Sequence, residues 1–280
     1  MTATATATPV LSLRGISKRF GAVQALTDVE IDVFPSEVVA LVGDNGAGKS
    51  TLVKVISGVG PANDGTIEFD GQRVSIEGPR DAQRLGIATV YQDLALADNL
   101  DVVANLFLGQ EERHAGVLDD IEMERQAREL LQTLSVKIPS VRTQVASLSG
   151  GQRQSVAIAR SLLGEPKIVI LDEPTAALGV AQTAEVIALI KRLKERGYGV
   201  IVISHNLADI FEVADRIVVL RLGRNAGEFD AHSDSSEDVV AAITGASDSA
   251  ALERERARIG KTHGDGGGGS GSGGTQEVQS

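Results

Sequence analysis

A glycine-rich segment between two apolar runs restricts this chain to a small set of folds. The segment, Gly43-Asp44-Asn45-Gly46-Ala47-Gly48-Lys49-Ser50-Thr51, fits the pattern G-x-x-x-x-G-K-[ST]. Residues 38–42 before it predict a buried parallel strand, and residues 52–56 after it have helical character. In this setting the glycines let backbone N–H groups turn inward, and the start of the helix adds partial positive charge. The segment therefore predicts a site for nucleotide phosphates rather than an ordinary turn.

Two pairs of residues carry the expected chemistry. Lys49 can reach the β- and γ-phosphates, and the Ser50 hydroxyl can hold Mg²⁺. A second apolar strand, residues 167–171, ends in Asp172 and Glu173. We expect Asp172 to hold Mg²⁺ through water, and Glu173 to orient or deprotonate the attacking water. Taken alone, these carboxylates could be a strand ending in a solvated acidic turn, but the phosphate loop upstream favours catalysis.

A third motif, Leu148-Ser149-Gly150-Gly151-Gln152, precedes a helical pattern that runs to residue 160. Ser149 and the two glycines present a hydroxyl and bare backbone N–H groups at the start of this helix. The helix terminus would then offer a second phosphate-binding surface. The alternative is an N-cap serine followed by a flexible turn.

With these motifs in this order, the chain resembles the ATP-binding subunits of ABC transporters over roughly residues 10–245. The resemblance implies an α/β fold of the P-loop NTPase class, in its ABC form. A mostly parallel core sheet would carry the phosphate loop, with an antiparallel β-subdomain near the adenine and a helical subdomain carrying the signature pentapeptide. It also implies ATP and Mg²⁺ as cofactors. Two copies would form a head-to-tail homodimer, in which the signature of each copy contacts the ATP bound by the other.

The resemblance assigns roles to further residues. Gln92, after the strand of residues 87–90, would touch Mg²⁺ or the attacking water and sense a membrane subunit. His205, after the strand of residues 201–204, would contact the γ-phosphate as a catalytic residue beside Glu173. Phe20 would stack on adenine, although core packing is an open alternative for this side chain. The implied ATP-binding set is Phe20, Gly43, Asp44, Asn45, Gly46, Ala47, Gly48, Lys49, Ser50, Thr51, Gln92, Ser149, Gly150, Gly151 and Gln152, and the implied metal set is Ser50, Gln92 and Asp172.

The chain departs from the resemblance at Gly179, where most relatives carry Asp in a loop that meets the facing subunit. Glycine has no side-chain acceptor, so coupling across the dimer through this loop is in question. The run Pro-Thr-Ala-Ala-Leu-Gly of residues 174–179 is, however, similar to the form found in monosaccharide-importer ATPases.

Segments around Gln92 also resemble ATPases of monosaccharide importers, with the single-domain fructose or xylose type the nearer match. We therefore expect a subunit that energises a membrane importer, with permease subunits as direct partners and a sugar-binding protein as an indirect one. The alternatives are an importer for a non-sugar solute and an ABC ATPase acting on ribosomes or DNA, which would show ribosome rather than membrane association. A non-hydrolytic interaction module would need a damaged Lys49, Asp172 or Glu173, and all three are intact.

Composition agrees with this interpretation. The net charge of −11 disfavours nucleic acid as a partner, because nucleic-acid-binding surfaces are usually basic. No apolar run reaches the roughly 18–20 residues that span a bilayer, and the start of the chain does not resemble a signal peptide. The absence of cysteine fits the cytoplasm. We therefore expect a peripheral protein on the cytoplasmic face of the membrane.

The expected organisation is a disordered lead over residues 1–9, one nucleotide-binding domain over 10–245 and a flexible Gly/Ser-rich tail over 246–280. Alternating polarity in residues 10–40 predicts antiparallel strands, and Asp70-Gly71 predicts a hairpin turn. Residues 95–160 should be rich in helix. Their apolar stripe, better explained as core than as a site, comprises Met123, Ala127, Leu130, Leu131 and Leu134.

Overall fold

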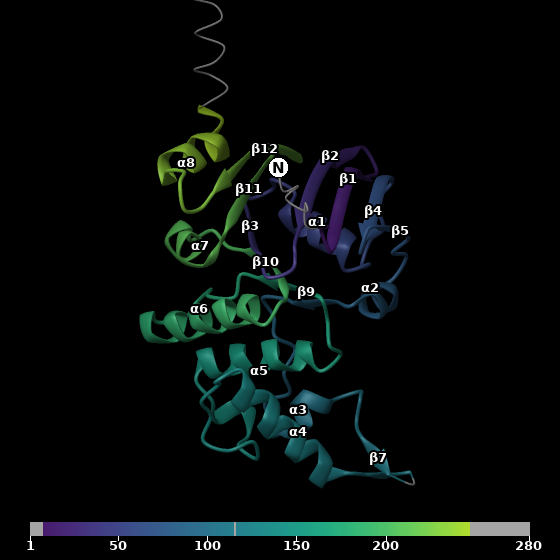
Figure 1. Ribbon diagram of the computed structural model, residues 1–280, viewed down its shortest axis with the longest axis vertical. Helices are drawn as coiled ribbons and strands as arrows, with labels where there is room; N and C mark the ends of the chain where they lie inside the picture. The colour runs from purple at the N-terminus through teal and green to yellow at the C-terminus, as the bar shows by residue number, and fades with distance from the viewer. Residues whose placement is uncertain (1–7, 115, 247–280) are drawn as a thin grey trace, which may run out of the picture.

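The computed structural model describes residues 8–114 and 116–246. Most of the lead and nearly all of the Gly/Ser-rich tail expected from the sequence lie outside these residues. A six-stranded sheet forms the centre of the molecule, in the order β12-β11-β3-β10-β9-β6 (Figure 1). The bounds are β3 Val38–Val42, β6 Ile87–Val90, β9 Ile168–Asp172, β10 Gly199–Ile203, β11 Arg216–Arg221 and β12 Arg224–Asp230. All neighbours in this sheet are parallel except the β11–β12 pair.

The central strands are continuous apolar runs because both faces of the sheet are covered. Every residue of β3 is buried. Val38, Ala40 and Val42 join one hydrophobic cluster, whereas Val39 and Leu41 join another, as the two-residue period of a strand requires. The helices α1 Lys49–Ile56, α6 Val180–Glu195 and α7 Leu207–Val213 add apolar faces to these clusters. The predicted parallel core is confirmed.

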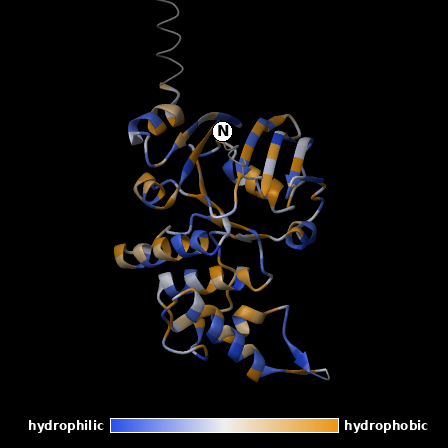
Figure 2. Cartoon of the chain, viewed as in Figure 1, coloured by the Kyte–Doolittle hydropathy of each residue, from blue (hydrophilic) through white to orange (hydrophobic). Residues whose placement is uncertain are grey.

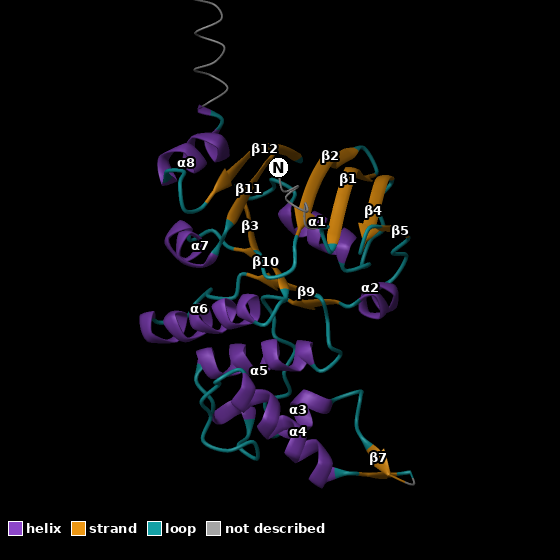
Figure 3. Cartoon of the chain, in the orientation of Figure 1, coloured by secondary structure: helices purple, strands orange, loops and turns teal. Residues whose placement is uncertain are grey.

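A second, antiparallel sheet has the order β2-β1-β4-β5 and stands beside the central sheet (Figure 3). Its strands are β1 Leu11–Phe20, β2 Val23–Val33, β4 Asp64–Phe69 and β5 Gln72–Val74. Strands β1, β2 and β4 alternate between hydrophobic and hydrophilic residues (Figure 2), which is the pattern of a sheet with one face buried. Asp70 and Gly71 both have positive φ, as the predicted two-residue hairpin turn requires.

A helical subdomain lies at the end of the molecule opposite to α8, Ser236–Thr244 (Figure 1). It contains α3 Val102–Phe107, α4 Asp120–Thr133 and α5 Gly150–Leu162, with the short helix η1 Val145–Ser147 before α5. Most of the predicted apolar stripe is buried, and Leu130 is only partly buried against the same core. A small hairpin, β7 Arg113–His114 and β8 Val117–Leu118, lies between α3 and α4. Its strands have only two exposed residues each, so the sequence shows no alternation of polarity that would predict them.

Parallel pairing brings several chain segments to one edge of the central sheet. Leu41 of β3 and Asp172 of β9 are both aligned with Ile203 of β10, while Val90 of β6 is aligned with Leu171. The carboxyl ends of these four strands therefore lie together, which is where open α/β sheets bind ligands. Helix α2, Pro79–Leu85, leads into β6.

Candidate functional site

The loop between β3 and α1 has a shape that only glycine allows at two positions. A Cβ on Gly43, where φ is 146°, would lie 2.2 Å from the carbonyl oxygen of Leu220. A Cβ on Gly48, where φ is 108°, would lie 2.7 Å from Cδ2 of Leu26. Both positions need a backbone conformation and a close approach that other residues resist. The loop is therefore packed onto its surroundings, with its exposed residues Asp44, Asn45 and Gly46 toward solvent.

Lys49 begins α1 and folds its side chain back over the loop. Its Nζ donates to the carbonyl oxygens of Gly43, at 2.6 Å, and Asp44, at 3.0 Å. Burial lowers the pKa of Lys49, and the nearby carboxylates of Glu173, Asp44 and Asp172 oppose that shift. A partly desolvated ammonium that donates to two carbonyls can exchange them for phosphate oxygens.

The rest of the loop contributes mainly through its backbone and the two hydroxyl residues that follow Lys49. Ala47 is buried, whereas the Ser50 side chain is exposed. Thr51 is half-buried on the first turn of α1. The predicted segment 43–51 is therefore assembled as one loop and helix start.

Asp172 ends β9 and lies close enough to Lys49 and Glu173 for their charges to act on it. Burial raises the pKa of Asp172, the Glu173 charge raises it further, and Lys49 opposes the shift. The next residue turns away, because Glu173 has a φ of 51° and donates its backbone N–H to the carbonyl of Ile203 at 2.9 Å. The Glu173 side chain therefore reaches the segment after β10, whereas Asp172 is part of β9 itself.

Glu173 meets His205, the residue predicted from the segment after β10. Glu173 Oε2 lies 2.9 Å from His205 Nδ1. The Glu173 side chain is 17% exposed and the His205 side chain 77% exposed, so a protected carboxylate meets a histidine that is open to solvent. His205 is therefore not a buried structural histidine.

Gln92 and Phe20 are both exposed. Gln92 follows β6 at the same sheet edge. Phe20, the last residue of β1, is 53% exposed, which excludes the core-packing alternative. Lys18 Nζ lies 5.3 Å from the centroid of the Phe20 ring, a favourable cation–π distance.

The signature pentapeptide lies in the helical subdomain, in a different part of the molecule from the phosphate loop (Figure 1). Ser149 is the N-cap of α5: its Oγ accepts from the Gln152 N–H at 3.2 Å, and Gln152 Oε1 accepts from the Ser149 N–H at 3.0 Å. Gln152 also donates to the Lys137 carbonyl at 2.9 Å, so its side chain serves the fold of the motif itself. Ser149 is therefore an N-cap, but α5 begins directly after it at Gly150, so the flexible turn of the alternative interpretation is not observed. Ser149 is exposed at a helix start that can receive an anion.

The loop of residues 174–179 lies directly against the signature. A Cβ on Gly150 would come within 2.9 Å of Leu178 Cδ2, and one on Gly151 within 3.0 Å of Gln182 Cβ. Gly179, where the resemblance expects Asp, is the N-cap of α6 with a φ of −76° and makes no side-chain cap. The two glycines of the signature therefore allow close packing as well as bare N–H groups.

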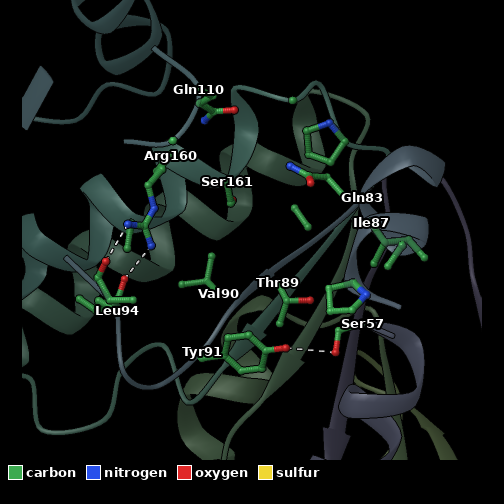
Figure 4. Close-up of a pocket in the computed structure, with 18 of the residues that line it drawn as sticks. Ser57, Gln83, Ile87, Thr89, Val90, Tyr91, Leu94, Gln110, Arg160 and Ser161 are labelled. Carbon is green, nitrogen blue, oxygen red and sulfur yellow. Dashed lines mark hydrogen bonds between the residues drawn. The ribbon is translucent and has the colours of Figure 1, made fainter. Parts of the chain in front are cut away.

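A groove of about 480 Å³ opens beside Gln92, between β6 and the helical subdomain (Figure 4). Gln83, Ile87 and Thr89 lie on one side of it, and Arg160 and Ser161 on the other. The contacts that shape this groove could not be predicted from the sequence. In the sequence, Arg160 is one more polar residue of a helix. The backbone carbonyls that it contacts, those of Leu94 and Ala95, lie more than 60 residues away in the chain.

The comparisons with known proteins agree with this geometry. The family profile described as "ABC transporter" matches residues 26–176. The chain is 44% identical over 246 residues to the fructose import ATP-binding protein FrcA of Rhizobium meliloti, covering 85% of this chain and 95% of that protein. It is 46% identical over 215 residues to the xylose/arabinose import ATP-binding protein XylG of Sulfolobus acidocaldarius, covering 77% and 86%. It is 42% identical to the ribose import ATP-binding protein RbsA 1 of Rubrobacter xylanophilus, covering 90% of this chain but 50% of that protein.

Solved structures lead to the same family. A nucleotide-free ATP-binding cassette from an ABC transporter is 26% identical and superimposes with a TM-score of 0.74, covering 85% of this chain and 96% of that one. A dimeric cassette in a post-hydrolysis state, bound to ADP and Pi, is also 26% identical, with a TM-score of 0.66 and coverage of 79% and 98%. The chain belongs to the ABC transporter family, as one of its ATP-binding and ATP-hydrolysing cassettes.

Proposed function

We propose that this chain uses ATP to energise a membrane importer for a monosaccharide. The observation that carries the proposal is the meeting of Lys49, Asp172, Glu173 and His205 at the carboxyl edge of one sheet, in a chain whose relatives are named for fructose, xylose/arabinose and ribose import. The residues of the site support ATP hydrolysis, and the names of the relatives support a monosaccharide as the transported substrate.

ATP would lie along the phosphate loop. Phe20, exposed at the end of β1, would stack on adenine, and the N–H groups of residues 43–51 would surround the phosphates. Lys49 would exchange the Gly43 and Asp44 carbonyls for β- and γ-phosphate oxygens.

The residues present fit Mg²⁺. Ser50 and Asp172 offer a hydroxyl and a carboxylate, the oxygen donors that this ion prefers, and no hydrogen bond from a described residue engages the Asp172 side chain. Among the described residues no cluster of three acidic, histidine or cysteine side chains could form a cage, which suits an ion held partly by phosphates. Bound there with Gln92 nearby, Mg²⁺ would neutralise charge on the phosphates.

Glu173 would act as the base or orienting group for the attacking water. Its carboxylate contacts His205, whereas Asp172 ends β9, so the two acids would serve different roles. His205, largely exposed, would reach the γ-phosphate.

A second copy would complete the site. Ser149 is exposed at the start of α5, where the half-buried Gly150 and the buried Gly151 follow it, in a subdomain that does not carry the phosphate loop. A head-to-tail pairing of two copies would give each ATP one phosphate loop and one signature, and a symmetric pair is the simplest closed solution. ATP would favour the closed pair, and hydrolysis would favour separation.

The groove beside Gln92 is the proposed binding site for the permease. It joins the nucleotide edge to the helical subdomain, and Tyr91, Asp93 and Leu94, which flank Gln92, line it. No helix among the described residues is long and apolar enough to cross a membrane. We place the chain at the cytoplasmic face of the membrane, bound to permease subunits, with a sugar-binding protein as an indirect partner and no nucleic acid.

The test is ATPase activity in proteoliposomes that contain this chain, a permease pair and a solute-binding protein chosen from the genes beside its own. Turnover should be slow for the isolated chain and should rise when the binding protein carries a pentose or hexose. Stimulation by amino acids or peptides but by no sugar would overturn the substrate class. Stimulation by ribosomes without the permease would overturn the transport role.

A further inference from the structure

The loop that carries Gln92 is attached at its two ends to two different helices. Before Gln92, the Tyr91 hydroxyl donates to Oγ of Ser57, at 3.1 Å. Ser57 is the C-cap of α1, the helix that begins at Lys49. After Gln92, the chain is held from α5 by Arg160 (Figure 4). Gln92 therefore lies between an anchor on the phosphate-loop helix and an anchor on the signature helix.

The contact made by Arg160 is a two-pronged clamp on the backbone. One terminal nitrogen donates to the carbonyl of Leu94 and the other to the carbonyl of Ala95, both at 2.8 Å. The planar guanidinium suits two such bonds at once, and a lysine would offer only one compact charge. The clamp fixes the orientation of the segment as well as its distance from α5.

Arg160 differs from three exposed arginines of the helical subdomain. Arg125, Arg128 and Arg142 are exposed and pair with glutamates. Arg160 forms no ion pair among the described residues, and burial lowers its pKa. A partly desolvated charge is costly unless hydrogen bonds compensate, so the two carbonyls stabilise Arg160 as much as Arg160 holds them.

The clamped segment has a conformation that needs support. Ala95 has a φ of 48°, in the left-handed region that costs energy for a residue with a Cβ. Ala97, two residues after Ala95, is held by the fully buried Asn105 of α3. The Asn105 side chain accepts from the Ala97 N–H at 2.7 Å and donates to the Ala97 carbonyl at 3.0 Å. The segment is thus held by α5 and α3 together.

We propose that Arg160 is a positioning residue that makes the signature helix and the Gln92 loop move as one body. Ser149 and Arg160 lie on the same helix, and a helix carries a displacement along its length. A shift of Gln92, from the nucleotide side or from the groove, would therefore displace Ser149 toward or away from the facing subunit. This inference rests on the proposed closure of two copies around ATP.

The first test measures closure in the full chain carrying Glu173→Gln, which should dimerise with ATP and Mg²⁺. Adding Arg160→Ala should weaken ATP-dependent dimerisation, measured by sedimentation, by about tenfold or more, a size typical of coupling between sites. The ATP affinity of the monomer should change by less than about twofold, because the clamp is remote from the phosphate loop. Arg160→Lys should recover only a small part of the loss. Arg128→Ala, which removes an exposed arginine from the same subdomain, is the matched control.

The second test measures position directly. The chain has no cysteine, so a variant with Arg73→Cys on β5 and Gln132→Cys on α4 would carry spin labels at these two positions and nowhere else. The distance distribution between the labels should broaden in the Arg160→Ala variant without nucleotide. An unchanged distribution, or dimerisation as strong as in the parent, would overturn the proposal. If the Glu173→Gln parent itself stays monomeric with ATP, the proposed closure fails, and the label distances still report separately on Arg160.

Discussion

Glu173 Oε2 lies 2.9 Å from His205 Nδ1, although the two residues follow different strands of the central sheet. The contact depends on the alignment of Ile203 with Asp172 and on the positive φ of Glu173. With its proton on Nδ1, the histidine donates a hydrogen bond to the carboxylate. The histidine therefore orients the carboxylate that we propose as the base.

Glu173→Gln should retain ATP binding and lose turnover by about 10²–10⁴-fold, since the amide keeps the shape but cannot accept a proton. A dimer should accumulate with ATP and Mg²⁺, observed by size-exclusion chromatography. Glu195→Gln, at the exposed end of α6, is the control and should behave as the parent. Turnover of Glu173→Gln at the parent rate would exclude Glu173 as the catalytic carboxylate.

Lys49→Ala should abolish ATPase activity and weaken ATP binding by about 10–100-fold, the equivalent of one lost charged hydrogen bond of about 1.5–3 kcal/mol. Isothermal titration with ATP and Mg²⁺ measures the affinity. Lys54→Ala removes an exposed lysine from the same helix and should leave both quantities unchanged. Unchanged affinity and turnover in Lys49→Ala would refute the phosphate-loop assignment.

Gly179→Asp should stabilise the chain by about 0.3–1 kcal/mol, through a side-chain cap and a favourable charge at the start of α6. The φ of −76° suits any residue, and a Cβ at this position meets nothing within 4 Å. Urea denaturation without nucleotide measures the effect. Gly179→Ala has no acceptor and should give no gain. A loss of stability in Gly179→Asp would show that the loop cannot accept the residue that the resemblance expects.

Asp215→Asn should destabilise the chain at pH 7 by about 1 kcal/mol after allowance for solvent screening. Burial alone would raise the pKa of Asp215, but hydrogen bonds from Lys194 and from the Val38 N–H, at 2.9 Å, lower it overall. A carboxyl group with a lowered pKa stabilises the fold above its unfolded pKa, and that contribution is lost as the pH falls through the folded pKa.

The difference between Asp215→Asn and the parent should therefore shrink below about pH 4. Urea denaturation across this range measures it, with Asp98→Asn, at an exposed carboxylate, as the control. A difference that does not vary with pH would mean that packing rather than charge is responsible.

Asn105→Leu should destabilise the chain by about 2–4 kcal/mol, because buried groups of the Ala97 backbone would lose their hydrogen bonds. The Asn105 side chain is fully buried and also donates to the carbonyls of Leu100 and Asp101. Thermal unfolding measures the loss. Stability equal to that of the parent would show that the segment after Gln92 does not depend on this anchor.

The sequence by itself determined the features that depend on local spacing. The phosphate loop needs its glycines and Lys49 at fixed separations, and the strand before it is recognisable because both faces of a parallel sheet are buried. The capping pattern of Ser149 and Gln152 is also local, so the start of α5 could be predicted. The order of these motifs was enough to indicate the ABC fold, now confirmed.

The tertiary structure alone decided the contacts between segments that are distant in the chain. The approach of His205 to Glu173 depends on strand order and register, which no local period encodes. The exposure of Phe20 depends on what packs against β1, so its sequence left core packing open. Arg160 reads as an ordinary helical residue, and its role arises only because the fold brings the backbone of Leu94 and Ala95 to it. Backbone carbonyls carry no sequence signature, since every residue has one.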